Sequence, residues 1–290
     1  MTTTEPVVGA AGSESAAATS PPEAIRQEAA LYRDGVVGLP GCFAPDWADA
    51  LREDFEQVFA WAQSYPGGTI SRGPARHYFA VQPERIRGFC DLLTHPAITA
   101  LCRQVLGDDY LVVELGFDVP LAGARDQPWH RDFATPPETA QEGRLTSLAF
   151  NITTVDVTPD LAPFEIAPGT HFDDGSDFAH GMFPAPEAYG RFESLASKRY
   201  PRRGDVSART GLTVHRGTQN FSDRSRAVLI LGVVTGDTDP EEVAVHGLEM
   251  TRTYHDGLPE EVRSHLLCRL VDELEPLVQK HDIEGLMMGG

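Results

Sequence analysis

Two histidines, one aspartate and one arginine in this sequence have the types and spacing of a metal site. His130 and Asp132 are two residues apart, His215 follows 83 residues beyond Asp132, and Arg226 comes 11 residues later. Because a strand presents residues i and i+2 on the same face, His130 and Asp132 can bind one metal ion together. With His215 they would form a two-histidine, one-carboxylate triad, which suits non-haem Fe(II) and leaves coordination positions open. Arg226 would add a planar fork for a dicarboxylate co-substrate.

A turn at residues 220–223 suggests how His215 and Arg226 approach each other. The turn lies between two β-rich segments, so these segments can pair as a hairpin. With Gly217 opposite Arg226, His215 lies opposite Val228, and cross-strand partners share a face. We therefore expect both side chains to point into one pocket, where Arg226 holds the far carboxylate of an acid that chelates the metal.

Residues 145–155 alternate between apolar and polar side chains. One face carries Leu148, Phe150 and Ile152, and the other includes Asn151 and Thr153. Such a strand packs one face on an apolar layer and turns the other toward a pocket. We expect Asn151 and Thr153 to contact the co-substrate.

A basic grouping stands out from the acidic background. It includes Arg72 and Arg76, with His77 and Phe79 beside them. The plain interpretation is a solvated surface. The alternative is that Arg72 and Arg76 hold an anionic group of the substrate at the pocket mouth, and that His77 and Phe79 also contact it.

The pattern of elements predicts an α+β fold. Helical periodicity precedes residue 108, β-rich segments follow to about residue 236, and an amphipathic helix is expected at about 259–280. This order indicates a double-stranded β-helix, or jelly-roll, core of the cupin-like type, flanked by N-terminal and C-terminal helices. Residues 1–22 are predicted to be a disordered tail before a single domain over 23–290. The long connection at 172–203 is typical of a lid.

Composition limits the partners. Acidic residues number 43 against 24 Lys and Arg, giving a net charge of −19, which argues against binding nucleic acid or an anionic membrane surface. There is no apolar run long enough to span a membrane and no basic N-terminal segment of a secretory signal. Four scattered cysteines without a CxxC pair favour a reducing, cytoplasmic location. Nothing in the sequence indicates the oligomeric state.

Five motifs, in this order along the chain, resemble the phytanoyl-CoA dioxygenase family of Fe(II)/2-oxoglutarate-dependent oxygenases. The resemblance covers about residues 28–236, and its most specific element is the last motif. The motifs are Tyr32-Arg33-Asp34-Gly35-Val36-Val37, Leu92-Leu93-Thr94-His95-Pro96, Trp129-His130-Arg131-Asp132, Pro168-Gly169-Thr170-His171 and His215-x-Gly217-x-x-Asn220-x-Ser222-x-x-x-Arg226.

The resemblance implies roles for four residues. His130, Asp132 and His215 would be the catalytic Fe(II) ligands, and Arg226 would bind the C5-carboxylate of 2-oxoglutarate. The enzyme would convert 2-oxoglutarate and O2 to succinate and CO2 while hydroxylating, or otherwise oxidising, an unactivated C–H bond of a small organic molecule. Because Asp132 occupies the carboxylate position, hydroxylation is favoured over halogenation.

Two other classes of protein could use the same residues. A cupin-like hydrolase or isomerase could bind zinc or manganese with this triad, and it would need neither O2 nor 2-oxoglutarate. A non-catalytic jelly-roll binding protein would take up metal without turnover, but it gives no reason for Arg226 to accompany the triad.

Overall fold

Helices form the N-terminal part of the chain and cover one side of the molecule. The computed structural model describes residues 21–239 and 247–279. As the helical periodicity before residue 108 predicts, this part of the chain contains helices. These helices are α1 (Pro21–Asp34), α2 (Pro45–Ala62), η1 (Pro83–Arg85), α3 (Phe89–Thr94) and α4 (Pro96–Leu106). The tail predicted at 1–22 lies outside the described residues except for Pro21 and Pro22, which begin α1.

A seven-stranded sheet, here called the major sheet, forms the centre of the molecule. Its strand order is β1-β8-β5-β10-β4-β3-β2, and every neighbouring pair is antiparallel. The strands are β1 (Val36–Leu39), β2 (Ile70–Ser71), β3 (Arg76–Ala80), β4 (Leu111–Pro120), β5 (Ser147–Thr153), β8 (Val206–Arg209) and β10 (Val228–Val234).

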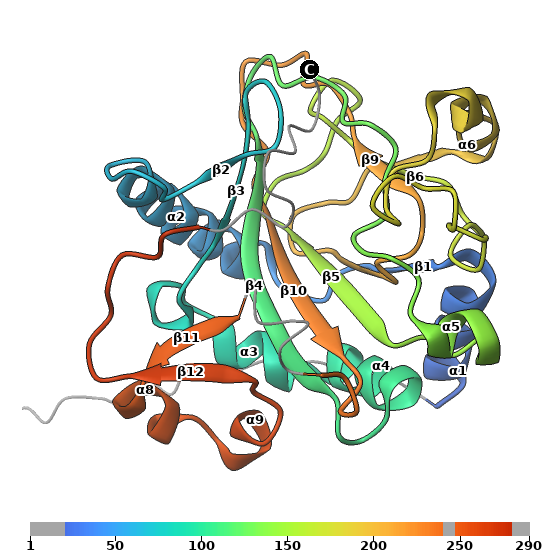
Figure 1. The fold of residues 1–290 in the computed structure, drawn as a ribbon. Helices are drawn as coiled ribbons and strands as arrows, with labels where there is room; N and C mark the ends of the chain where they lie inside the picture. Colours follow the sequence, from blue (N-terminus) through green and yellow to red (C-terminus); the bar gives the residue numbers. More distant parts are fainter. Residues whose placement is uncertain (1–20, 240–246, 280–290) are drawn as a thin grey trace, which may run out of the picture.

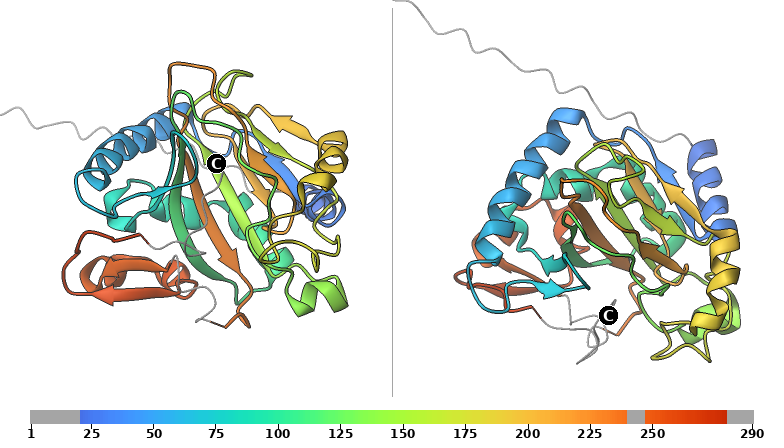
Figure 2. Two further views of the ribbon diagram at one scale, coloured as in Figure 1. Left: turned by 45° about the horizontal axis from the view of Figure 1, so that its top comes forward. Right: turned by 90° about the horizontal axis from the view of Figure 1, so that it is seen from above.

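A three-stranded sheet, the minor sheet, faces the major sheet. It has the order β7-β6-β9, from β6 (Phe164–Ile166), β7 (Ser197–Arg199) and β9 (His215–Gly217). Figures 1 and 2 show β6 and β9 on one side of the major sheet, with α2, α3 and α4 on the other. Two facing antiparallel sheets with helices on the outer face form the predicted jelly-roll architecture.

The two faces of the major sheet differ in chemistry, as the alternation in β5 predicts. Leu148, Phe150 and Ile152 lie in the main apolar core with side chains from α2, α3 and α4. Ser147, Ala149 and Asn151 line a cavity between the sheets. One face therefore stabilises the fold, and the other is available for chemistry.

The amphipathic helix predicted at about 259–280 is wrong. Helix α9 covers only Glu260–Arg263, and the chain then forms β12 (Cys268–Val271), which pairs in parallel with β11 (Leu248–Thr251); α8 (Arg252–Gly257) lies between β11 and α9. Leu266, Cys268 and Leu270 all pack on the main core, at a spacing of two that suits a strand. Residues 265–267 also exchange backbone hydrogen bonds with Val112, so tertiary pairing overrides the helical periodicity.

The long segment at 172–203 contains regular structure. It includes η2 (Pro186–Ala188), α6 (Tyr189–Leu195) and strand β7, while α5 (Pro137–Glu142) precedes it. The buried Arg131 guanidinium donates to the backbone carbonyls of Thr170 and Asp173 at the start of this segment. These hydrogen bonds tie residue 131 to the start of the segment. No helix within residues 21–239 or 247–279 is long and apolar enough to cross a membrane.

Candidate metal centre

His130 and His215 meet because their backbones pair directly. The His130 amide donates to the His215 carbonyl at 3.0 Å, and the His215 amide donates to the His130 carbonyl at 2.9 Å. This antiparallel bridge extends the minor sheet by one short segment beyond β9. The ring centroids lie 4.4 Å apart. Two residues far apart in sequence therefore present their imidazoles to the same point.

Both imidazoles are oriented by a backbone carbonyl two residues earlier in the chain. The Nδ1 atom of His130 lies 2.9 Å from the Pro128 carbonyl, and Nδ1 of His215 lies 2.8 Å from the Thr213 carbonyl. Since a carbonyl only accepts, each Nδ1 carries the proton of its hydrogen bond, and each Nε2 is the ring nitrogen left to bind a metal. Burial, together with the neighbouring His215, lowers the pKa of His130 to about 3. The neutral imidazole is the form that binds a metal.

Asp132 supplies the third donor. Its amide donates to the Gly211 carbonyl at 2.8 Å, and one carboxylate oxygen, Oδ1, lies 3.4 Å from Nε2 of His215. The other oxygen, Oδ2, accepts a hydrogen bond from the buried Arg209 guanidinium. Burial alone would raise the pKa of Asp132, but Arg209 and His215 lower it below its usual range. One ligand atom from each of His130, Asp132 and His215 lies within 4.8 Å of the others.

Arg226 lines the same cavity, as expected, but the strand pairing that places it there differs from the predicted pairing. β9 pairs with β6, whereas β10 pairs with β4 and β5, so the predicted hairpin between β9 and β10 is wrong. Arg226 and His215 instead approach from opposite sheets of the jelly roll, and both line the cavity. Burial lowers the pKa of Arg226 to about 10, which keeps it cationic at neutral pH.

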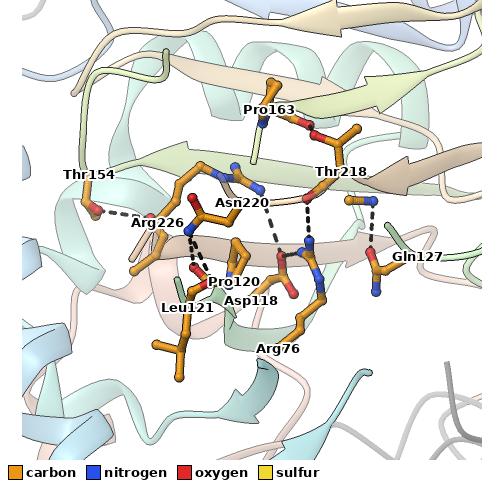
Figure 3. Close-up of polar contacts among 12 residues, drawn as sticks. Arg76, Asp118, Pro120, Leu121, Gln127, Thr154, Pro163, Thr218, Asn220 and Arg226 are labelled. Atoms are coloured by element: carbon orange, nitrogen blue, oxygen red, sulfur yellow. Dashed lines mark hydrogen bonds and ion pairs between the residues drawn. The ribbon is translucent and has the colours of Figure 1, made fainter. Parts of the chain in front are cut away.

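Asp118 holds two arginines at this end of the cavity. Its Oδ2 accepts from Nη1 of Arg76 at 3.0 Å and lies 4.0 Å from Nη2 of Arg226 (Figure 3). Arg76 also donates to the Thr218 carbonyl at 3.0 Å. Asn220 fixes the preceding turn by donating to the carbonyls of Pro120, Leu121 and Arg224. Asp118 and the turn held by Asn220 therefore fix the position of Arg226.

The cavity has a volume of about 440 Å³ and runs between the sheets. Of the residues predicted to contact co-substrate or substrate, Asn151 and Arg72 line it. Thr153 is buried but does not line the cavity, and Arg76 lies behind Asp118 rather than at the mouth.

The placement of His77 and Phe79 contradicts their predicted contact with substrate. Their side chains lie on the face of β3 that packs against Phe59 of α2, whereas Tyr78 between them lines the cavity. The alternation of a strand explains the difference, because neighbouring residues point to opposite faces.

The sequence interpretation missed Arg209 and Glu114, which line the cavity beside Tyr78. Arg209 ends β8 opposite Ala149, and Glu114 lies on β4 opposite Gly232. Tyr78 donates a hydrogen bond to Glu114 at 2.5 Å. A charged residue in a mostly apolar strand is the sequence signal that could have indicated one of them, since residues 111–119 contain only Glu114 and Asp118 as charged residues.

Several solved structures share this fold. The epimerase SnoN, crystallised with Fe3+, alpha ketoglutarate and nogalamycin RO, is 18% identical with a TM-score of 0.62 and covers 93% of this chain and 99% of its own. The carbocyclase SnoK from nogalamycin biosynthesis is 20% identical with a TM-score of 0.58, covering 72% of this chain and 83% of its own. EctD from S. alaskensis with bound Fe is 19% identical with a TM-score of 0.57, covering 80% and 82%.

The family assignment comes from the sequence match. No curated protein matches the chain. The family described as phytanoyl-CoA dioxygenase (PhyH) matches residues 31–228, a span that includes all four residues of the candidate centre. This match confirms the predicted family and enzyme class, and the structural neighbours confirm the jelly-roll fold. The chain belongs to the phytanoyl-CoA dioxygenase family of non-haem Fe(II)/2-oxoglutarate-dependent enzymes.

Proposed function

We propose that this enzyme hydroxylates an unactivated C–H bond of a small organic molecule, using Fe(II), 2-oxoglutarate and O2. The observation that supports the proposal most is the convergence of His130, Asp132 and His215 within 4.8 Å in the cavity that Arg226 also lines. Solved structures with this fold include an epimerase, a carbocyclase and EctD, so other oxidative outcomes begin from the same type of site. Cytoplasmic location remains a prediction.

The donor set fits Fe(II). Two neutral imidazole Nε2 atoms and one carboxylate oxygen form the facial triad that binds non-haem iron with positions left for other ligands. In this proposal His130 and His215 bind through Nε2, and Asp132 binds through Oδ1 while Arg209 holds Oδ2. When bound, the iron and its co-substrate supply the oxidising power for attack on the C–H bond.

The surroundings of Arg226 fit the far carboxylate of 2-oxoglutarate. The guanidinium is buried, its Nε has no hydrogen-bond partner among the described residues, and its nearest carboxylate, on Asp118, is 4.0 Å away and shared with Arg76. A buried guanidinium in this situation is stabilised by a further anion with two parallel acceptors. Asn151 can contribute a second polar contact, because it lines the same cavity and its Oδ1 has no partner in the described parts of the chain.

The rest of the chain orients the substrate and excludes water. Phe183 lies 6.0 Å from the His130 ring, measured between centroids, and Met182 lines the cavity beside it. Both residues come from the segment at 172–203, which we propose acts as a lid. Arg72 at the cavity wall remains a candidate for an anionic group of the substrate.

Succinate formation tests the proposal. Purified enzyme is incubated with Fe(II), 2-oxoglutarate and air, with and without a pool of small metabolites, and succinate is measured. We expect succinate that depends on both Fe(II) and O2 and that disappears in Asp132→Ala. Turnover of a metabolite without O2 or 2-oxoglutarate would instead support a metal-dependent hydrolase or isomerase. Metal uptake without any turnover would support a binding protein.

A further inference from the structure

One cross-strand row of the major sheet carries charged side chains at both ends and small residues between them. Arg209 pairs with Ala149, Ala149 pairs with Gly232, and Gly232 pairs with Glu114. All four residues line the cavity. Three strand spacings separate the backbones of Arg209 and Glu114, about 14 Å in total. The row therefore forms a floor for a small molecule, with the candidate metal centre at its Arg209 end.

Among the described residues, the partner of Glu114 differs in kind from the partners of the other two carboxylates that line the cavity. Asp118 is paired with Arg76, and Asp132 is paired with Arg209. Among the described residues, no arginine, lysine or histidine forms an ion pair with Glu114, whose Oε1 accepts a hydrogen bond from the Tyr78 hydroxyl at 2.5 Å. Glu114 is half-buried, and a carboxylate partly withdrawn from water is stabilised by a cation.

The position of Gly232 brings the Glu114 carboxylate over the floor. A Cβ atom at residue 232 would lie 2.8 Å from Oε2 of Glu114 and 2.7 Å from its Cβ. The absence of a side chain at Gly232 thus leaves the space that the carboxylate occupies. Tyr78 holds Oε1, while Oε2 lies above the floor and can accept hydrogen bonds from a bound molecule.

Ser147 gives an independent sign of a ligand at this end. Its side chain lines the cavity and the residue is only 7% exposed, yet Oγ has no hydrogen-bond partner within residues 21–239 and 247–279. Ser147 is the diagonal neighbour of Gly232 across the β5–β10 pairing, about 7–8 Å away. A buried hydroxyl without a partner is unfavourable, so a polar group of a ligand would stabilise it.

We propose that Glu114, held by Tyr78 and assisted by Ser147, binds a cationic amino group of the substrate. The substrate class is then a small organic amine whose carbon skeleton lies on Ala149 and Gly232 and whose reacting carbon faces the metal centre. A primary ammonium has three donors, which suits Oε2 of Glu114 and the Ser147 hydroxyl. The placement of the reacting carbon at the metal centre rests on the proposed function, whereas the binding of the amino group by Glu114 does not.

The test uses three probes that share a ring and differ in charge: phenethylammonium, 2-phenylethanol and phenylacetate. Their dissociation constants are measured by calorimetry, without O2, on enzyme loaded with Fe(II) and 2-oxoglutarate. We expect wild-type enzyme to bind phenethylammonium about tenfold or more tightly than 2-phenylethanol, as for a charge-assisted hydrogen bond. Glu114→Gln should abolish this preference, and Ser147→Ala should weaken phenethylammonium binding about fivefold.

A matched variant separates the local effect from the acidic surface. Glu56 on α2 is exposed, and Glu56→Gln removes the same charge far from the cavity, so it should keep the full preference for the amine. Equal binding of the amine and the alcohol, preference for phenylacetate, or an unchanged preference in a folded Glu114→Gln variant would overturn the proposal.

The visible absorption band of 2-oxoglutarate chelated to Fe(II) reports on the proposed function separately. If Glu114→Gln forms the band but loses the amine preference, the subsite proposal is supported. If the band never forms in wild-type enzyme while the amine preference is present, the proposed function fails and the subsite proposal stands.

Discussion

The two ends of the cavity differ in how their charges are balanced. At the metal end, Asp132 contacts His215 and Arg209, and Asp118 holds Arg76 and lies beside Arg226. At the other end, Glu114 has a tyrosine hydroxyl as its hydrogen-bond donor and lies above a floor of Ala149 and Gly232. At the metal end, charges held by protein partners give a preorganised centre for the reaction. A charge left for the ligand gives selectivity for one class of molecule.

The largest expected effect comes from removing a ligand at the metal end. In His215→Ala, Fe(II) loses one of three protein donors, so activity should fall at least about a hundredfold. Metal content after dialysis and succinate formation are the measurements. His255→Ala on α8, outside the cavity, is the matched control and should retain metal and activity. Retained iron and turnover in His215→Ala would remove this residue from the centre.

Arg226 gives the next largest effect. Arg226→Ala removes the proposed partner of the far carboxylate, so the KM for 2-oxoglutarate should rise about 10- to 100-fold. Arg226→Lys keeps the charge but loses the planar fork, and an intermediate KM is expected. Initial rates at varied 2-oxoglutarate give both values. A KM unchanged in both variants would show that the co-substrate binds elsewhere.

Arg209 links the two ends of the cavity, because it contacts Asp132 of the metal centre and also belongs to the floor. Arg209→Ala removes the hydrogen bond to Oδ2 of Asp132, so metal affinity should fall about tenfold, as for other residues that orient a ligand. Mn(II) binding measured by electron paramagnetic resonance reports this without turnover. Arg203→Ala, which breaks an exposed ion pair with Asp49, should leave the affinity unchanged. Equal Mn(II) affinities in wild-type enzyme, Arg209→Ala and Arg203→Ala would show that Arg209 does not orient the metal ligand.

The smallest expected effect is at Gly232. In Gly232→Ala the new methyl group meets Glu114 and pushes its side chain off the floor. We expect phenethylammonium binding to weaken by about 1 kcal/mol, in the range for overpacking at one site. Affinity for 2-oxoglutarate should not change, because Arg226 lies six residues before Gly232, ahead of the start of β10, and is too far from the new methyl group to contact it. Equal losses for both ligands would mean that the variant distorts the whole cavity.

The sequence predicts the metal end far better than the amine end. His130 and Asp132 are recognisable because their spacing alone puts them on one strand face, and Arg226 follows His215 at a characteristic distance. Glu114 can be recognised in the sequence only as a charged residue within a mostly apolar strand, and its relation to Arg209 depends on the pairing of four strands.

Tertiary pairing also accounts for the wrong predictions. The turn at residues 220–223 suggested a hairpin between β9 and β10, but the two strands belong to opposite sheets of the jelly roll. In the C-terminal segment, apolar residues satisfy both a helical and a strand period, and pairing of residues 265–267 with the start of β4 selects the strand.

The proposed function requires three side chains from separate segments to bind one ferrous ion beside Arg226. A crystal structure of enzyme soaked with Fe(II) and 2-oxoglutarate without O2, with anomalous data at the iron edge, tests it directly. We expect one strong peak within coordination distance of His130, Asp132 and His215, with the far carboxylate of 2-oxoglutarate on Arg226. A peak elsewhere, or an Arg226 that does not touch 2-oxoglutarate, would contradict it.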